Sequence, residues 1–257
     1  MNTIRNIGTI AARDFRAFFS SPIFYIVTAG FMVIMGWMFF NNLSYFNLQN
    51  MQHAQYQYGQ STSITEGIVR PLYGNMNVMF LFFAPFITMR LFSEERKMHT
   101  IELLLTSPIT LGELVIGKFL ASFYFVLFML VATMIYPVIL YTTGNPDLGP
   151  IATSYLGTFL MTSCYLALGL FFSSMTENQI VAGALTFAAG LFFWLINWAS
   201  QMAGTFWGEV LQYLSLIQHF NNFARGVIAT SDLIFYVSFI GLSLFFTHRV
   251  MDSYRWR

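Results

Sequence analysis

One run of residues has the spacing of a nucleotide-binding motif. Gly112, Gly117 and Lys118 match the G-x-x-x-x-G-K part of a phosphate-binding loop. That loop requires a Ser or Thr after the lysine to hold magnesium, and it connects a strand to a helix. Here Phe119 follows the lysine, no strand-like segment precedes the run, and a long apolar segment follows. We therefore predict that the match is coincidental and that the chain contains no ATPase domain.

Few other side chains are arranged for chemistry. The single cysteine, Cys164, lies in an apolar segment, so the chain has no disulfide framework. Four histidines are scattered without metal-ligand spacing, and we predict no bound cofactor or metal: His53, His99, His219 and His248. The apolar segments contain essentially no Asp, Glu, Lys or His, which disfavours a membrane-embedded transferase. An ion-driven secondary transporter, the other alternative, would need such carboxylates or matched broken helices; only Pro85 and Pro137 interrupt the segments.

The composition indicates a membrane protein. Of 257 residues, 56% are hydrophobic and only 9% charged, and the mean hydropathy is +0.61. A soluble domain usually carries about 25% charged residues. Continuous apolar runs of about 20 residues favour helices over a barrel. We predict an all-α integral membrane protein, one domain over 1–257, with six transmembrane spans at about 23–40, 72–90, 118–142, 151–173, 179–200 and 231–247.

Arginine and lysine predict the orientation. Six spans place both termini on one side, and loops rich in Arg and Lys face the cytoplasm. Ten of the twelve basic residues fall on the side of the termini, so we expect both termini in the cytoplasm of a bacterial inner membrane: Arg5, Arg13, Arg16, Arg90, Arg96, Lys97, Lys118, Arg249, Arg255 and Arg257. The other side holds only Arg70 and Arg225.

The first 21 residues predict an amphipathic helix before the first span. Apolar residues recur at helical spacing over 4–19, namely Ile4, Ile7, Ala11, Phe15 and Phe18. Arg5, Arg13 and Arg16 lie on the opposite face, which suits a helix in the cytoplasmic membrane interface. The alternative is a basic flank that only sets the orientation.

The loop between spans two and three concentrates charge. We expect a helix over about 92–107, with Ser93 as a possible N-cap and with Glu94 and Glu95 in its first turn, where the helix dipole favours anions. Leu103, Leu104 and Leu105 give this helix an apolar face, and Ser107-Pro108 ends it. A short charged helix beside the membrane suits docking of a soluble protein. The alternative is a solvated loop whose charges only set the topology.

Two outward segments are less distinctive. Residues 41–71 form a polar loop without catalytic residues, suited to an external cap or docking surface. Residues 201–230 are partly apolar and predict short helices that re-enter the outer leaflet. Within them Glu209, His219 and Arg225 would be costly in lipid unless paired or solvated. The alternative is a surface amphipathic hairpin.

At two places the sequence resembles the ABC-2 type permeases, closest to the branch that holds the gliding-motility permease GldF and the copper-assembly permease NosY. The first place runs from Glu94-Glu95-Arg96-Lys97 through Thr100–Pro108 to Glu113 and Gly117-Lys118. The second is Leu214–Leu216, His219-Phe220, Phe223, Arg225–Ile228 and Asp232. The family usually has Gly where this chain has His99, a departure that affects the turn or the fit to a partner.

The resemblance implies a type V exporter-like permease that pairs with a second copy or with a related membrane subunit carrying a large external domain. Two copies of a cytoplasmic ATPase, which hold ATP and Mg²⁺, would sit beneath the pair. The charged helix would be the coupling helix, and 201–230 would help to close an outer gate, with Glu209, His219 and Arg225 as candidates. Work at the envelope, including gliding motility, is implied; the chain would contact lipids and no nucleic acid. The expected ATPase contacts are Phe92, Glu94, Glu95, Arg96, Lys97, Glu102 and Leu104.

Overall fold

The computed structural model describes residues 3–55, 63–102, 109–144, 146–202 and 204–254, and within them every regular element is a helix. The elements are α1 (Thr3–Ser20), α2 (Pro22–Gln55), the π-helical turn η1 (Thr65–Val69), α3 (Arg70–Thr88), α4 (Ser93–Lys97), α6 (Leu111–Thr133), α7 (Ile135–Thr143), α8 (Leu148–Met175), α9 (Gln179–Met202), α10 (Thr205–Leu214), α11 (Leu216–Ala224) and α12 (Thr230–Tyr254).

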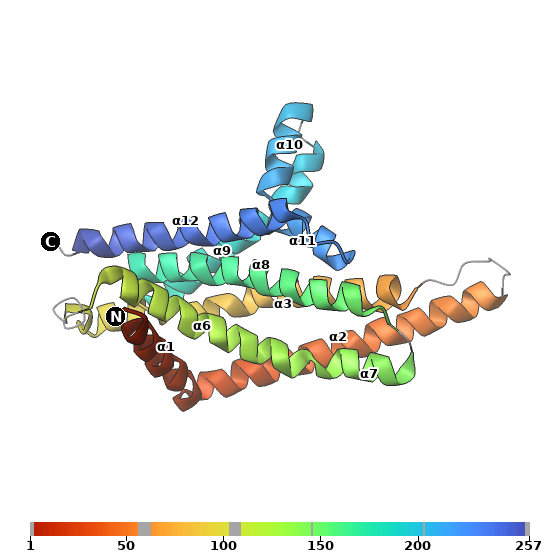
Figure 1. Ribbon diagram of the computed structural model, residues 1–257, viewed down its shortest axis with the longest axis horizontal. Helices are drawn as coiled ribbons and strands as arrows, with labels where there is room; N and C mark the ends of the chain where they lie inside the picture. The colour runs from red at the N-terminus through yellow and green to blue at the C-terminus, as the bar shows by residue number, and fades with distance from the viewer. Residues whose placement is uncertain (1–2, 56–62, 103–108, 145, 203, 255–257) are drawn as a thin grey trace.

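Six helical segments of the described chain are long and apolar enough to cross a membrane. They begin at Pro22, Thr65, Leu111, Leu148, Gln179 and Thr230. Long helices lie side by side in one bundle, with the first turns of α1 and the last turns of α12 at the same end (Figure 1). We call this the terminal end. The predicted all-α fold with six spans is confirmed.

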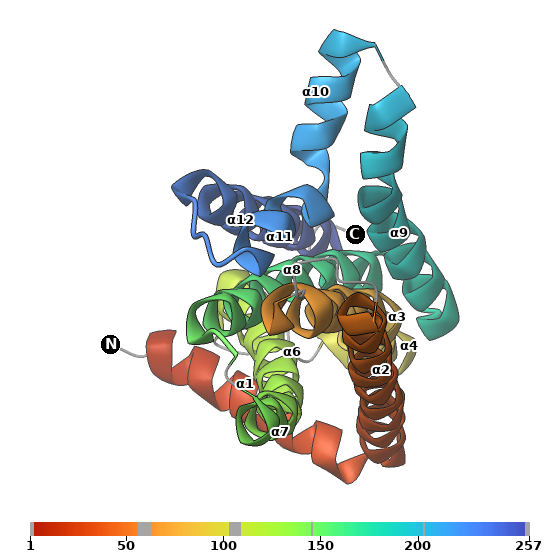
Figure 2. The ribbon, with the colours of Figure 1, turned by 90° about the vertical axis from the view of Figure 1, so that its right-hand side faces the viewer.

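Helix α8 occupies the centre of the bundle. In the end-on view it lies between α11 and α12 on one side and α3 and α6 on the other, with α1 across the lower edge (Figure 2). Its most apolar stretch is 72% buried, whereas the corresponding stretches of α2, α9 and α12 are only 22–28% buried. The peripheral helices therefore present broad apolar faces, as expected where lipid or another membrane subunit covers them.

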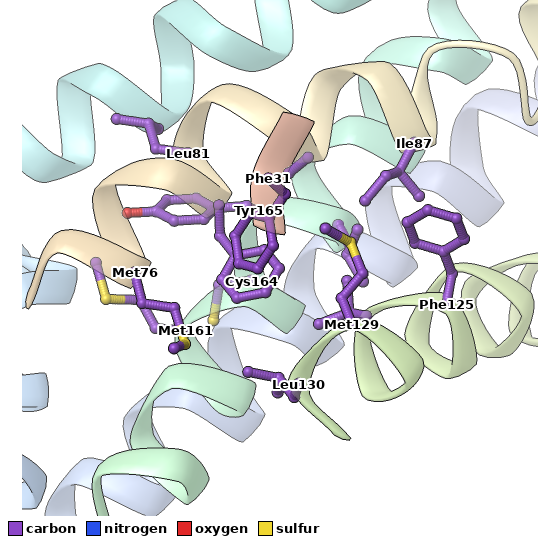
Figure 3. Close-up of a cluster of buried hydrophobic side chains, with 14 of the residues drawn as sticks. Phe31, Met76, Leu81, Ile87, Phe125, Met129, Leu130, Met161, Cys164 and Tyr165 are labelled. Atoms are coloured by element: carbon purple, nitrogen blue, oxygen red, sulfur yellow. The ribbon is translucent and has the colours of Figure 1, made fainter. Parts of the chain in front are cut away.

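Four helices meet in the central part of the hydrophobic core. Phe31 of α2, Met76 of α3, Met129 of α6 and Met161 of α8 are each fully buried and meet in one cluster (Figure 3). Cys164 lies in the same cluster as a buried free thiol. Flexible methionines and flat aromatic rings fill the irregular space between crossing helices.

The predicted outward loop 41–71 is wrong over its first part, because α2 continues to Gln55. Leu43 and Phe46 pack against the core beyond the apolar stretch, and Phe46 lies against Gly67 of η1. Residues 41–55 are also rich in good helix formers. Hydropathy therefore marks where the chain leaves the apolar layer, whereas the helix itself ends later.

Two other boundaries differ from the prediction for clear reasons. The third span is divided into α6 and α7 at Met134, three residues before Pro137, which cannot donate a hydrogen bond to the preceding turn. The last span continues past 247 to Tyr254, because buried Thr247 and Met251 still face the bundle.

Two short helices, α10 and α11, lie within the predicted segment 201–230 and differ in position. Helix α10 packs against α9 and projects from the bundle, whereas α11 packs on α8 (Figures 1 and 2). Gly226, at a φ of 88°, turns the chain from α11 toward α12. A Cβ atom there would lie 3.2 Å from Pro150, so glycine suits both the backbone conformation and the close approach.

Candidate functional site

Helix α4, in yellow, lies at the terminal end (Figure 1) and contacts α8 and α9. Glu94 and Glu95 occupy its first turn and Arg96 and Lys97 its last, an order that complements the helix dipole. A five-residue helix cannot be stable alone. The contacts that hold it therefore define the site.

The N-terminus of α4 is capped by another helix. We expected Ser93 as the N-cap, but its hydroxyl donates back to the carbonyl oxygen of Met89. Instead, the hydroxyl oxygen of Ser173 in α8 accepts hydrogen bonds from the backbone N–H groups of Phe92 (3.0 Å) and Ser93 (3.2 Å). The start of α4 is thus fixed to the end of the central span, and the N-cap prediction is corrected.

Glu95 ties α4 to α6 and α1. Its Oε1 accepts a hydrogen bond from Nζ of Lys118 at 2.7 Å, and the same ammonium group donates to Asp14 of α1 at 3.2 Å and to the carbonyl oxygen of Leu91 at 2.6 Å. The Lys118 side chain is only 3% exposed. Breaking a buried ion pair costs far more than losing a surface pair, so this cluster holds three elements together.

Arg13 of α1 borders the same cluster. Burial alone would lower the pKa of its guanidinium, but the hydrogen bond to Asp14 and the attraction of Asp14 and Glu95 outweigh burial and raise that pKa. Its Nε donates to Asp14 at 2.8 Å, and Nη2 lies 3.5 Å from Glu95. The Arg13 guanidinium therefore stays charged beside these carboxylates.

Arg96 points in the opposite direction from Glu95. Its guanidinium donates to the carbonyl oxygen of Ser174 in α8 at 3.0 Å and to Glu177 in the α8–α9 turn at 3.2 Å. The same group lies 4.3 Å from the centre of the Tyr254 ring in α12, a cation–π contact. Two adjacent residues thus connect α4 to opposite sides of the bundle.

The predicted helix over 92–107 is not continuous. Helix α4 ends at Lys97, and His99 has a φ of 55°. The N–H of Thr100 bonds to the carbonyl oxygen of Glu95, and the N–H of His99 to that of Arg96, which together form a Schellman motif. The position that follows the C-cap in this motif favours glycine, so His99 holds this turn in a strained backbone conformation.

The remaining predicted contact residues differ in exposure. Glu94, Lys97 and Glu102 are exposed, as are Met98 and His99 between them. Phe92 is fully buried and supports α4 from within. Leu104 lies outside the described residues. An exposed, mixed-charge edge on a firmly held backbone is therefore present at the terminal end.

Helix α1 packs along α6 rather than lying free. Gly117 allows the contact, because a Cβ atom there would lie 2.8 Å from the side chain of Ile10. Thr110 and Glu113 form a capping box at the start of α6, and Asn6 of α1 donates to the Glu113 carboxylate at 3.3 Å. The run with the spacing of a phosphate-binding loop is therefore helical, and its glycine serves helix packing.

The predicted gate residues lie toward the opposite end of the bundle, and they differ in how deeply they are buried. His219 of α11 is buried: Nδ1 lies 2.6 Å from Asp232 of α12, and Nε2 lies 2.9 Å from the carbonyl oxygen of Tyr213. Asn222 donates to the second oxygen of Asp232 at 2.8 Å, and the His219 ring stacks on Phe235 at 4.0 Å.

Glu209 and Arg225 are exposed and do not join this cluster. His219 therefore joins α10, α11 and α12 into one unit, but the structure does not bring the three predicted gate residues together.

Sequence reasoning missed the partners that complete both clusters. Lys118 counted only toward orientation, the phosphate-loop motif and the family resemblance, and no ion pair was predicted for it; Asp14 and Ser173 were not considered as partners. The available signal was a lysine two turns into an apolar helix, which requires a counter-ion. Asp232 belongs to the second stretch that resembles the ABC-2 permeases. It is also a carboxylate in the first turn of an apolar helix, which likewise requires a polar partner.

Comparison with known proteins agrees with this architecture. None of the curated proteins compared with the chain matches it. A family model described as "ABC-2 family transporter protein" matches residues 8–254, which is nearly the whole chain. With its six apolar helical segments, the protein is a multi-pass membrane protein that belongs to the ABC-2 transporter family.

Proposed function

We propose that the chain is the permease subunit of an ABC transporter and that a separate cytoplasmic ATPase docks on the exposed edge of α4. The family match supports the transporter class. The observation that carries the docking proposal is α4 itself, since its exposed Glu94 and Lys97 flank Glu95 and Arg96, which are held by ion pairs to other elements. A helix that exposes charged side chains to solvent, and whose other side chains are fixed to the bundle, suits transmission of force from a soluble partner.

Charge distribution supports a cytoplasmic terminal end. Arg96 and Lys97 of α4 and Arg249 near the end of α12 belong to the ten basic residues assigned to the side of the termini. Arg70 and Arg225, the two assigned to the other side, border α3 and α11 far along the bundle. By the positive-inside rule, this distribution supports our proposal that both termini lie in the cytoplasm.

The proposed coupling works through rigid contacts. ATP binding closes the ATPase dimer, and the resulting displacement of α4 moves α1 and α6 through Glu95 and moves α8 and α12 through Arg96. Such an assembly has two arrangements, and a ligand bound on another subunit shifts their populations. ATP and Mg²⁺ belong to the partner in this proposal, and this chain supplies no catalytic residue.

Two ATPase copies and a second membrane subunit complete the proposed complex. The exposed apolar faces of α2 and α9 offer surfaces for another permease copy or for a related subunit with a large external domain. At the opposite end, α10 and α11 are proposed to help close an outer gate, with His219 as the buried member and with Glu209 and Arg225 exposed. The likeness to GldF and NosY favours transport or mechanical work at the envelope, including gliding motility.

The test is copurification after charge reversal. We expect the native protein to copurify with an ATPase that carries a complete phosphate-binding loop. Glu94→Lys combined with Glu102→Lys should lower the yield of copurified ATPase about tenfold or more, because like charges across an interface are strongly unfavourable. Membrane insertion should be unchanged.

Glu209→Lys is the control, since it makes one such charge reversal at an exposed site on α10, and Glu94→Lys alone is its matched counterpart on α4. Equal ATPase yield from the α4 variant and from this control would disprove docking at α4. Labelling of Lys97→Cys only from outside the cell would disprove the orientation.

A further inference from the structure

A cavity of about 330 Å³ lies at the terminal end, beside the buried ion cluster. Its walls come from α1, α2, α3, α4 and α6 and from the turn between α3 and α4. Ligand pockets in proteins range from about 300 to 1,000 Å³. The cavity can therefore hold a polar headgroup together with the first part of an apolar chain.

The polar side of this cavity contains two unsatisfied groups. Nε of Arg90 is buried and has no hydrogen-bond partner within the described chain, and none of its ion pairs involves Arg90. Oε2 of Glu95 is also buried and unpartnered, although Oε1 is bound by Lys118. Buried polar atoms normally have partners, so a donor and an acceptor here are both available to a ligand.

The charge balance selects the kind of ligand. Arg90 and Lys118 face three carboxylates in the cavity wall, those of Asp14, Glu94 and Glu95. Arg13, which pairs with Asp14 and Glu95, brings the basic groups to three, so the charges balance. A purely anionic ligand would leave the site with a net negative charge. A zwitterion leaves the balance unchanged, since its phosphate can accept from Arg90 while its ammonium donates to Glu94 or Glu95.

The other walls are apolar and aromatic. Phe18, Phe24 and Phe125 meet there, with ring centres of Phe24 and Phe125 5.0 Å apart and of Phe18 and Phe125 5.2 Å apart. The cavity also lies where α1 meets the ends of α2, α3 and α6, which is where the headgroups of a surrounding bilayer would lie. An amphiphile matches this wall, whereas a fully polar solute does not.

We propose that this cavity binds a phospholipid with a primary ammonium headgroup, of the phosphatidylethanolamine type. Arg90 binds the phosphodiester, Glu94 and the free oxygen of Glu95 accept from the ammonium, and the aromatic wall contacts the upper part of one acyl chain. A choline headgroup cannot donate hydrogen bonds to these carboxylates, and a glycerol headgroup offers them no positive charge. The bound lipid would join α1 to α2 and α3, independently of any ATPase.

The experiment is native mass spectrometry of the full-length protein in detergent. Phosphatidylethanolamine, phosphatidylcholine and phosphatidylglycerol with identical acyl chains are added in equal amounts. We expect about tenfold more ethanolamine lipid than choline lipid bound at the tightest site. Arg90→Gln should remove this tight binding, and Glu94→Gln should reduce the preference for ethanolamine over choline several-fold.

Arg16→Gln is the matched control, because Arg16 is an exposed arginine of α1 that does not line the cavity. It should leave the preference intact. Soluble phosphoethanolamine, added at the same concentration, should not displace the lipid; displacement would show that the apolar wall contributes nothing and would overturn the lipid assignment.

Equal binding of the three lipids by the native protein would overturn the proposal, as would a full preference retained in Arg90→Gln. If Arg90→Gln does not fold, the ethanolamine-to-choline ratio in Glu94→Gln decides, since that side chain is exposed and its change leaves the fold intact. An unchanged ratio there would reject the ammonium site.

Discussion

Nζ of Lys118 lies 2.7 Å from Oε1 of Glu95, and this contact joins the first turns of α6 to the short helix α4. The same ammonium group holds Asp14 of α1 at 3.2 Å. One lysine therefore fastens three elements at the terminal end, in the part of the molecule that we propose receives an ATPase. The stability of this cluster decides whether α4 moves with the bundle or independently of it.

Replacing Lys118 by methionine should destabilise the protein strongly. The side chain keeps its length, but Glu95 and Asp14 lose their buried cation, and loss of one partner of a buried ion pair costs about 3 kcal/mol or more. The buried thiol of Cys164 reports unfolding, because a thiol-reactive dye labels it only when the core opens. Lys97→Met, an exposed change on α4, should leave the melting temperature nearly unchanged. Equal melting temperatures for the two variants would contradict a structural role for the cluster.

Gly117→Ala should separate α1 from α6. The new Cβ atom would lie 2.8 Å from Cβ and Cγ2 of Ile10, and such overpacking costs about 1–3 kcal/mol. Gly112→Ala in the same helix meets no atom within 4 Å and should be neutral or slightly stabilising. Dye-monitored melting and the rate of proteolysis within α1 measure both effects. The assignment of Gly117 to helix packing fails if both alanine variants behave alike.

His99→Gly should stabilise the protein. His99 has a φ of 55°, a conformation that costs an ordinary residue roughly 1 kcal/mol and glycine little. His248→Gly provides the opposite case, because position 248 lies within α12, where glycine costs roughly 1 kcal/mol. The two melting temperatures should therefore shift in opposite directions. A fall for His99→Gly would show that the imidazole makes a stabilising contact that outweighs the backbone strain.

Asp232→Ala should loosen α11 from α12. His219 and Asn222 both bond to this buried carboxylate, and hydrogen bonds to charged groups contribute about 1.5–3 kcal/mol each. The melting temperature should fall by several degrees, and proteolysis within 203–229 should become faster. Glu209→Ala removes an exposed carboxylate from α10 and should change neither quantity. Unchanged proteolysis in Asp232→Ala would mean that packing alone holds α11 in place.

The amino-acid sequence predicts where helices form better than it predicts which helices contact one another. Apolar runs located all six spans, and the charge pattern placed Glu94 and Glu95 in the first turn of α4. These features depend on residues close together in the chain. The cap that Ser173 provides to α4 depends on a contact 80 residues away, and no local pattern specifies it.

The predicted helix lengths were wrong for a related reason. Hydropathy ended the first span near residue 40, yet α2 continues to Gln55 because Phe46 finds a packing partner at Gly67. The turn at His99 was only partly predictable: the family resemblance marked a position that usually holds Gly, but a histidine alone does not specify a positive φ. Tertiary contacts decided both cases, and tertiary contacts are what a single sequence expresses least directly.

Arg96→Lys tests whether α4 transmits force rather than merely binding a partner. The guanidinium reaches α8, the α8–α9 turn and α12 at once, through the Ser174 carbonyl oxygen, Glu177 and the Tyr254 ring. Lysine keeps the charge but cannot reproduce that planar, forked geometry. We therefore expect the ATPase to copurify normally while transport per ATP hydrolysed falls several-fold. Arg249→Lys, an arginine of α12 near the same end, should preserve both quantities. Loss of ATPase binding in Arg96→Lys would instead place this arginine in the docking surface, and full coupling would show that the connection to α8 and α12 is not needed.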